Sequence, residues 1–417
     1  PAPSATPTLT MSSPKNSQPG SAARATTPLW KRLFSAQESG LVIVIALIMG
    51  ALTYFGGTKQ AIVRIEVPAS ATVEARGERE LIVREVGGGR ERVHESESGW
   101  RIQMLDDGSH VALGRQTVNA FFETGNLVQQ TTTASFIAVM AVGMTAIIIL
   151  AGIDISIGSI YALSAMLAAM AVSALSKDEG SVWRSALLAV PLTLVVAGAA
   201  GGACGFVNGA LSVGLRVHPF VITLGTMAIF RGVVFVLSEG QTVSGLPDSI
   251  QKGFFKFEYA GVYPVPTIAM LLVAIAGGFV LSRTVLGRRV YAIGGNETAA
   301  RYAGVPVGRV KIIVYTIAGA LAGLSAAMYI GYFGASESNA GAGYELKVIA
   351  AAVIGGASLS GGRGSAVGAV LGAIMVQLID NGMIILGIDQ SYNQIVMGSA
   401  IILAVAVDQA KTRLSGK

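Results

Sequence analysis

The sequence is poor in the side chains that carry most protein chemistry. It has a single cysteine, Cys204, so no disulfide can form within the chain. Its three histidines (His94, His110 and His218) are scattered, and their spacing fits no metal-ligand motif. Clustered histidines or carboxylates, which a membrane enzyme would need, are not found either. The sequence therefore offers no basis for a metal site or a catalytic residue.

A nucleotide-binding loop is also missing from the sequence. The pattern GxxxxGK[ST] does not occur, and the nearest glycine cluster, SGGRGS at 360–365, lacks the lysine and a preceding strand of a soluble domain. We therefore expect this chain to bind no cofactor and to hydrolyse no ATP.

Charged residues are scarce, at 13% of the chain against roughly 25% in soluble domains, whereas 52% of the residues are hydrophobic. This composition predicts an all-α polytopic membrane protein. The 53 glycines fit close helix packing in lipid. A net charge of +6 would be compatible with nucleic acid binding in a soluble protein. Here the excess lies mainly in loops expected on the inner side of a membrane, so we expect lipid and no nucleic acid as a partner.

The N-terminal segment, residues 1–40, is rich in Pro, Ser, Thr and Ala and is predicted to be disordered and cytoplasmic. Lys31 and Arg32 precede an apolar run, and we expect 41–56 to be the first transmembrane helix, entering from the inside. A signal peptide is the alternative interpretation, but no A-x-A cleavage site follows the run.

Residues 57–118 interrupt the apolar pattern, with nine basic and ten acidic residues between Lys59 and Arg115. DDGS at 106–109 predicts a hairpin turn. Three segments alternate apolar and polar residues as half-buried strands do: 62–67, 81–86 and 100–105. We expect a small β-rich extracytoplasmic insert. A core of about 60 residues is marginal alone, so the insert should lean on the membrane domain or on a partner.

The rest of the chain, 119–410, is the expected transmembrane domain. Its predicted spans are 131–152, 157–176, 186–213, 219–238, 264–284, 311–333, 346–359, 364–386 and 392–409. With the first helix this makes about ten crossings, although 346–359 is shorter than the roughly 20 residues that a span needs. Ten crossings that start inside place the tail, 411–417, in the cytoplasm as well.

A polar loop at 285–311 separates two of these spans. From Arg283 to Lys311 the chain has six basic residues and one acid, Glu297. Such an excess marks the cytoplasmic side. Residues 296–303 predict a short helix that is capped by Asn296 and ends at Gly304. A short inner helix without a catalytic group indicates docking to a partner.

Asp154 is the most conspicuous charge inside the apolar part of the chain, in the stretch AGIDISIGSIYAL at 151–163. A charge at the bilayer centre costs about 2.5–3.5 kcal/mol, so it needs a reason to be there. One interpretation is a broken helix beside a polar pathway that Asp154 and Ser156 line. The other is a short inner loop whose aspartate caps the next helix.

Small and amide side chains form a second pattern. Three sets of glycines recur every four residues, which places each set on one helix face for tight packing: Gly201, Gly205 and Gly209; Gly319 and Gly323; and Gly364, Gly368 and Gly372. Asn208 and Asn381 lie near the ends of apolar spans. A buried amide needs partners, which an interhelical hydrogen bond or a passing polar solute could supply.

The stretch 217–232 opens with His218, which we interpret as a structural loop residue before a helix start. Thr223 and Arg231 then fall on an otherwise apolar span. Two interpretations of Arg231 are open. It pairs within the bundle, where Glu239 lies eight residues further along the chain, or it lines a cavity.

Several long stretches resemble the permease subunits of bacterial ATP-binding-cassette (ABC) monosaccharide importers of the ribose and xylose type, in the superfamily of branched-chain amino acid permeases. The resembling stretches lie within about 127–408 and follow one another in the order expected for that family. It is carried by AVGMTAIIILAGIDISIGS, GFVNGALSVGLRVHPFVITLGTMAIFRG, GRRVYAIGGNETAARYAGV, YELKVIAAAVIGGASLSGGRGSAVGAV and DNGMIILG.

The resemblance implies a homodimer of ten-span, non-catalytic permeases in the bacterial inner membrane. Its expected partners are a cytoplasmic ATPase, which carries ATP and magnesium, and an extracytoplasmic sugar-binding protein. A coupling helix in 285–311 would contact the ATPase through Asn296, Glu297, Ala300, Arg301 and Gly304. Asp154, Ser156, Asn208, Thr223 and Asn381 would lie along or near the translocation pathway. The 57–118 insert departs from the family, which has only a short outer loop there.

A stand-alone secondary transporter of a small polar solute is the alternative. It would need acids within the membrane for ion coupling. Asp154 and Asp380 are the candidates, and the sequence shows no obvious partner for either. The sequence does not name the transported sugar.

Overall fold

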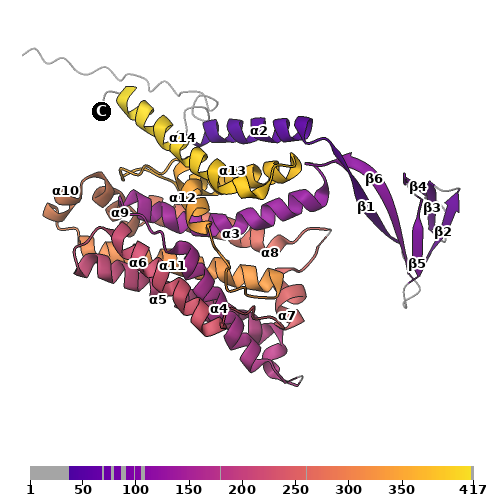
Figure 1. Cartoon of the computed structure of the whole chain (residues 1–417), viewed down its shortest axis with the longest axis horizontal. Coiled ribbons are helices and arrows are strands. Elements are labelled where there is room, and N and C mark those ends of the chain that lie inside the picture. The colour runs from indigo at the N-terminus through magenta and orange to yellow at the C-terminus, as the bar shows by residue number, and fades with distance from the viewer. Residues whose placement is uncertain are drawn as a thin grey trace, which may run out of the picture.

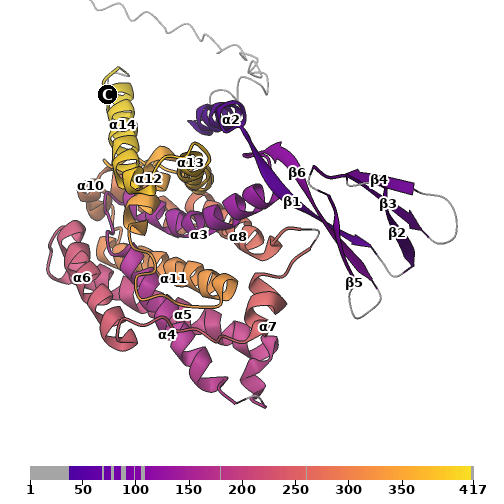
Figure 2. The same ribbon diagram turned by 45° about the vertical axis from the view of Figure 1, so that its right-hand side comes forward.

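The computed structural model describes residues 37–67, 70–76, 79–85, 91–97, 99–104, 109–178, 180–259 and 261–414. Helices form one body, and the strands project from one end of it (Figures 1 and 2). The short helices α9 and α10 lie at the opposite end (Figure 1). The two polar parts of the sequence, the 57–118 insert and the 285–311 loop, are therefore at opposite ends of the body.

Seven helices in the described part of the chain are long and apolar enough to cross a membrane. They are α3 (Thr124–Ile149), α4 (Ile157–Leu175), α5 (Ala186–Gly214), α6 (Pro219–Ser238), α8 (Pro264–Arg283), α11 (Val307–Phe333) and α13 (Ala366–Ile385). The remaining helical segments are α2 (Gln37–Phe55), η1 (Val182–Arg184), α7 (Asp248–Ile250), η2 (Gln251–Phe255), α9 (Val285–Gly295), α10 (Glu297–Tyr302), α12 (Tyr344–Ile354), η3 (Gln390–Tyr392) and α14 (Asn393–Leu414). The chain is thus a mostly helical polytopic membrane protein.

Several predicted boundaries differ from the helix bounds of the structure, and two of them are instructive. Residues 37–40, assigned to the disordered N-terminal segment, already belong to α2, while residues 1–36 lie outside the described part. The span predicted from 131 begins at Thr124, where Glu123 accepts hydrogen bonds from the amides of Gly125 and Asn126. That polar first turn is helical because it is capped, a property that hydrophobicity alone does not detect.

Helix α3 is the central element of the helical body. It packs against α8, α11, α12 and α13, and nearly all of its apolar length is buried. A helix that is apolar all round belongs in the interior of a bundle. Its 26 residues are unbroken from the end that bears the strands to the end that bears α9.

Glycine permits a close crossing between α5 and α11. Gly201 and Gly205 lie against the α11 backbone at Gly319 and Tyr315, and Gly209 lies against Ile312. A Cβ atom at Gly201 or Gly205 would overlap a carbonyl oxygen of α11. Small residues therefore let the two backbones touch, as in other membrane helix pairs.

A second close crossing joins α12 and α13. Gly368 and Gly372 face the α12 carbonyls of Gly355 and Ala351. Gly364 does not belong to this face, contrary to the predicted ladder. It precedes the helix, whose N-cap is Ser365, and its φ of 155° lies outside the helical region. Its carbonyl instead accepts a hydrogen bond from the Tyr291 hydroxyl, 2.7 Å away.

Six strands lie between α2 and α3: β1 (Thr58–Val67), β2 (Ala71–Arg76), β3 (Glu80–Glu85), β4 (Glu91–Glu95), β5 (Arg101–Met104) and β6 (His110–Asn119). They form two antiparallel sheets, ordered β1-β6-β5 and β2-β3-β4. The three segments expected to be strands overlap β1, β3 and β5. The predicted turn at 106–109 lies almost wholly outside the described residues.

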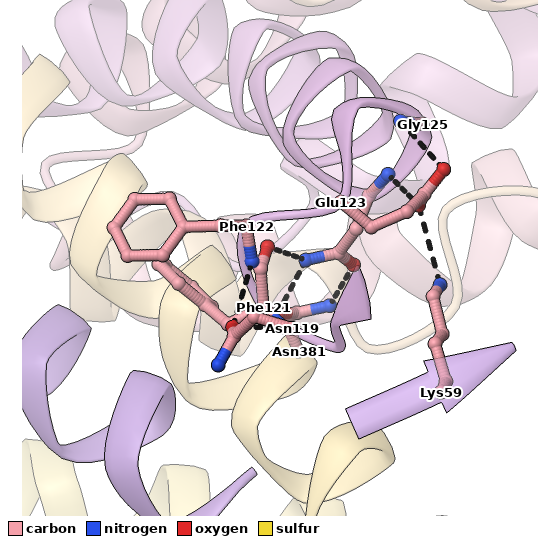
Figure 3. A network of polar contacts seen from close by, with 8 residues as sticks. Lys59, Asn119, Phe121, Phe122, Glu123, Gly125 and Asn381 are labelled. Atoms are coloured by element: carbon pink, nitrogen blue, oxygen red, sulfur yellow. Dashed lines mark hydrogen bonds and ion pairs between the residues drawn. The ribbon is translucent and has the colours of Figure 1, made fainter. Parts of the chain in front are cut away.

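A polar network ties the base of this insert to the helices (Figure 3). Lys59 of β1 pairs with the Glu123 carboxylate at 3.2 Å. The Asn119 side chain, at the end of β6, accepts hydrogen bonds from the amides of Phe121 and Phe122 and donates one to the Thr53 carbonyl of α2. The insert therefore joins the membrane helices through a defined junction and not through a loose linker.

Candidate functional site

The polar loop folds into two short helices that pack against the bundle. In α9, Gly287, Val290 and Ile293 are buried, whereas Arg288 and Arg289 are exposed. The Thr284 hydroxyl caps α9 by accepting a hydrogen bond from the Gly287 amide. This alternation of apolar and basic residues fixes which face of α9 contacts the membrane helices.

Helix α10 confirms the predicted short helix. The Asn296 side-chain oxygen accepts a hydrogen bond from the Ala299 amide at 2.9 Å, which caps the first turn. Ala300 is buried beneath the helix. Gly304 ends it with φ at 79°, a left-handed conformation that glycine adopts without strain.

Glu297 pins α10 to the start of α11. Its carboxylate pairs with Lys311 at 2.8 Å and with Arg301 at 3.0 Å. The hydrogen bond from Lys311 is the main cause of the lowered pKa of Glu297, and Arg301 adds to it against the opposing effect of burial. Because this pKa lies below its ordinary value of 4.5, the pairing is present at neutral pH. It is lost only on acidification through the lowered pKa.

Tyr302, which the sequence analysis did not single out, is the most exposed aromatic side chain of the loop. It ends α10 and is 87% exposed. A large aromatic residue on a polar surface is a common anchor at protein interfaces. The sequence signal for Tyr302 was a large aromatic residue within a short predicted helix that is otherwise polar or small.

The loop touches the ends of the membrane helices through glycine backbones. Gly294 of α9 lies against the Ile149 carbonyl at the end of α3 and against the Gly362 amide. That amide donates a hydrogen bond to the same Ile149 carbonyl at 2.9 Å. A displacement of α9 must therefore push directly on the last turn of α3.

A buried polar cluster lies a few residues beyond that turn. Asp154 accepts hydrogen bonds from the amide and hydroxyl of Ser156 and, at 3.2 Å, from the Asn208 amide group. Asn208 also donates to the Ser156 hydroxyl at 2.7 Å, and the Ile155 amide donates to the Thr223 hydroxyl. All four side chains are buried. They hold the segment between α3 and α4 against α5 and α6.

The structure therefore brings together four of the five residues expected near a pathway. Asp154 lies two residues before Ser156, the N-cap of α4, and accepts a hydrogen bond from the Ser156 amide, so the capping residue is the serine and not the aspartate of the helix-capping interpretation. The fifth residue, Asn381, is elsewhere and exchanges hydrogen bonds with Asn126 of α3. This amide pair belongs to the junction near the insert (Figure 3).

Asp380 has partners that the sequence did not reveal. Its carboxylate pairs with Lys347 of α12 at 2.5 Å and accepts a hydrogen bond from Asn393 of α14 at 2.6 Å. The sequence showed no obvious partner because the lysine lies 33 positions away and no local pattern links the two. Paired in this way, Asp380 is a weak candidate for ion coupling.

Two further polar residues have structural contacts. Arg231 donates hydrogen bonds to the carbonyls of Ser338 and Ala340 and does not pair with Glu239. His218 is the N-cap of α6 and accepts a hydrogen bond from the Phe220 amide. Within the described ranges, no three His, Cys, Asp or Glu side chains form a group that could hold a metal ion.

An apolar bundle, a glycine-packed core and an exposed helical loop at one end define a membrane permease component without catalytic residues. Residues 126–405 match the family described as branched-chain amino acid transport system / permease component. The chain belongs to this family.

Named relatives give the same assignment. The chain is 39% identical over 297 residues to the ribose import permease protein RbsC of Escherichia coli K12. The matched residues make up 71% of this chain and 87% of that relative. It is 39% identical over 289 residues to the D-allose transport system permease protein AlsC of the same organism, covering 69% and 85%. It is 33% identical over 289 residues to the autoinducer 2 import system permease protein LsrC of Klebsiella pneumoniae, covering 69% and 80%. No solved structure matches the chain.

Proposed function

We propose that the chain is the membrane subunit of an ABC importer that carries a monosaccharide or related polyol inward. The relatives are named for the import of ribose, D-allose and autoinducer 2. An ATPase subunit supplies ATP and magnesium chemistry in this proposal, and a separate binding protein delivers the solute. Two copies of the chain surround the pathway.

The proposed topology has ten crossings, with both termini in the cytoplasm. It adds α2, α12 and α14 to the seven long apolar helices. The basic loop with α9 and α10 then lies inside and the β strands lie outside, in agreement with their positions at opposite ends of the body (Figure 1). The insert is in position to meet the binding protein.

The arrangement of α10 is the observation that carries the proposal. The helix is exposed, capped at both ends and held to α11 by Glu297, so it can be displaced by a bound partner as a rigid unit, without unfolding. The backbone contact of Gly294 with Ile149 would transmit that displacement to the end of α3. The next segment, which contains Asp154, is clamped to α5 and α6 by the buried polar cluster. Energy from the ATPase would reach the helices around the pathway by this route.

Copurification of the membrane complex with its ATPase tests the proposal. Glu297→Ala removes both ion pairs of α10, and Gly304→Arg forces a side chain into a left-handed backbone at the end of the helix. Both variants are expected to lose bound ATPase and ATP-driven uptake while remaining in the membrane.

Lys252→Ala is the control, because it removes an ion pair that is also four residues apart, with Asp248, outside the polar loop. It should retain the ATPase. Normal ATPase binding and uptake in both loop variants would contradict the proposed coupling role of α10.

A further inference from the structure

An open, basic cavity of about 910 Å³ lies beside α10, which contributes Glu297 and Arg301 to its lining. The turn that joins α5 to α6 forms one wall, and the start of α11 forms the other. Four residues in its lining are cationic: Arg216, Arg301, Arg309 and Lys311. Glu297 is the one acidic residue in that lining.

Two of these four cationic side chains have no acidic partner within the described part of the chain. Glu297 is already engaged by Arg301 and Lys311. Arg216 and Arg309 are exposed and have no ion pair or side-chain hydrogen bond among the described residues. The lining therefore carries an excess of positive charge on two arginines, one directly after the C-cap of α5 and one in the first turn of α11.

The backbone at Arg216 is a second, independent observation. Its φ is 56°, one of three positive values among the described non-glycine residues. It directly follows Leu215, the C-cap of α5, at a position where glycine is the usual residue. This conformation is less favourable for an arginine than for a glycine, so the backbone alone would favour glycine at this position.

The start of α11 adds backbone donors to the same cavity. Its N-cap, Pro306, provides no side-chain hydrogen bond to the first turn, and Gly308 and Arg309 of that turn line the cavity. Free amides at the beginning of a 27-residue helix favour an anion.

The surroundings indicate which anion. Val217 lines the basic cavity, and Leu215 and Phe220 are the chain neighbours of the lining residues Arg216 and Pro219. All three apolar side chains are exposed, with Leu215 at 61%. Exposed apolar side chains beside a cluster of arginines form a surface for a molecule with a charged head and an apolar tail. In the proposed topology, on which this step rests, the cavity opens at the inner leaflet, where basic groups attract anionic lipids.

We propose that this cavity binds the phosphate of an anionic phospholipid of the cytoplasmic leaflet through Arg216 and Arg309. The lipid tail lies along the apolar collar of Leu215, Val217 and Phe220. Binding would hold the α5–α6 turn against the start of α11, next to the ion pairs of α10. The lipid would thereby stabilise the position of α10 at the membrane surface.

The test uses the full-length permease in nanodiscs of phosphatidylcholine that contain a minority of phosphatidylglycerol. Native mass spectrometry measures how much phosphatidylglycerol stays bound to the permease after the permease is released from the nanodisc. Each arginine near an anionic surface contributes about fivefold in affinity, so Arg216→Gln with Arg309→Gln should weaken retention about 30-fold. Arg216→Gly removes the charge and also relieves the left-handed backbone, so it should bind less lipid while unfolding at the same or a higher temperature.

Arg288→Gln with Arg289→Gln is the control, because these arginines are exposed on α9 and do not line the cavity. This pair should retain the lipid. Equal retention in the wild type and the Arg216/Arg309 variant, or an equal loss in the control, would overturn the proposal. Displacement of phosphatidylglycerol by soluble glycerol 3-phosphate would assign the site to a soluble phosphate ester instead.

The proposal can fail independently of the proposed function. Loss of ATPase copurification in the Arg216/Arg309 variant with lipid retention unchanged would make the cavity part of the ATPase interface and would refute the lipid site. Loss of lipid with the ATPase still bound supports the site. The Glu297→Ala variant leaves Arg216 and Arg309 in place, so loss of its ATPase with the lipid retained would concern the coupling role and not the lipid site.

Discussion

Adding one methyl group at Gly294 tests the contact between the polar loop and α3. A Cβ atom there would overlap the Ile149 carbonyl and the Gly362 amide. Both are backbone atoms, so a change of rotamer cannot relieve the clash. Overpacking of this kind costs about 1–3 kcal/mol.

Gly295→Ala provides a matched control one residue along the same helix, because a Cβ atom at that position meets nothing within 4 Å. Both substitutions give α9 the same gain in helix propensity, about 1 kcal/mol for glycine replaced by alanine. The difference between the two variants therefore isolates the steric cost at the contact.

Thermal unfolding of the purified permease in nanodiscs and ATP-driven uptake in vesicles are the two assays. Gly294→Ala should unfold at a lower temperature and take up less sugar per ATP hydrolysed, because α9 is displaced from the end of α3. Gly295→Ala should match or slightly exceed the wild type in both. Equal behaviour of the two variants would refute the contact and the route of coupling drawn from it.

Two further predictions concern buried polar contacts. Asn208→Leu removes the donor to Asp154 and Ser156, and it should lower the free energy of unfolding by about 1.5–3 kcal/mol in a denaturant titration; an unchanged midpoint would contradict the buried cluster. A double-mutant cycle of Asn126→Leu and Asn381→Leu should give a coupling energy of about 0.6 kcal/mol, typical of polar pairs between membrane helices, and strictly additive effects would show that the pair does not form.

Local patterns made the polar loop predictable. A side-chain cap, one helical turn and a terminal glycine lie within nine residues, so the structure agrees with the prediction for α10 from Asn296 to Gly304. The glycines of α5 were also readable, because a spacing of four residues fixes a helix face before its neighbour is known.

Contacts between distant positions were not predictable from one sequence. Asn208 meets a carboxylate 54 positions away, and Asn381 meets an amide 255 positions away. Each side chain looks the same in the sequence whether it binds a neighbouring helix, a solute or water. The αL backbone of Arg216 and the exposure of Tyr302 likewise depend on where the next helix packs.

The continuity of α3 has a mechanical consequence. Its first turn is capped by Glu123, which Lys59 of the β insert holds, and its last turn lies against Gly294 of the polar loop. At 1.5 Å per residue, its 26 residues form a strut about 39 Å long. A stiff strut cannot tilt at one end and stay still at the other. In the proposed topology, a partner that contacts the insert outside and a partner that contacts the α9–α10 loop inside would therefore act on the same rigid helix, and each could affect the other without involving the solute.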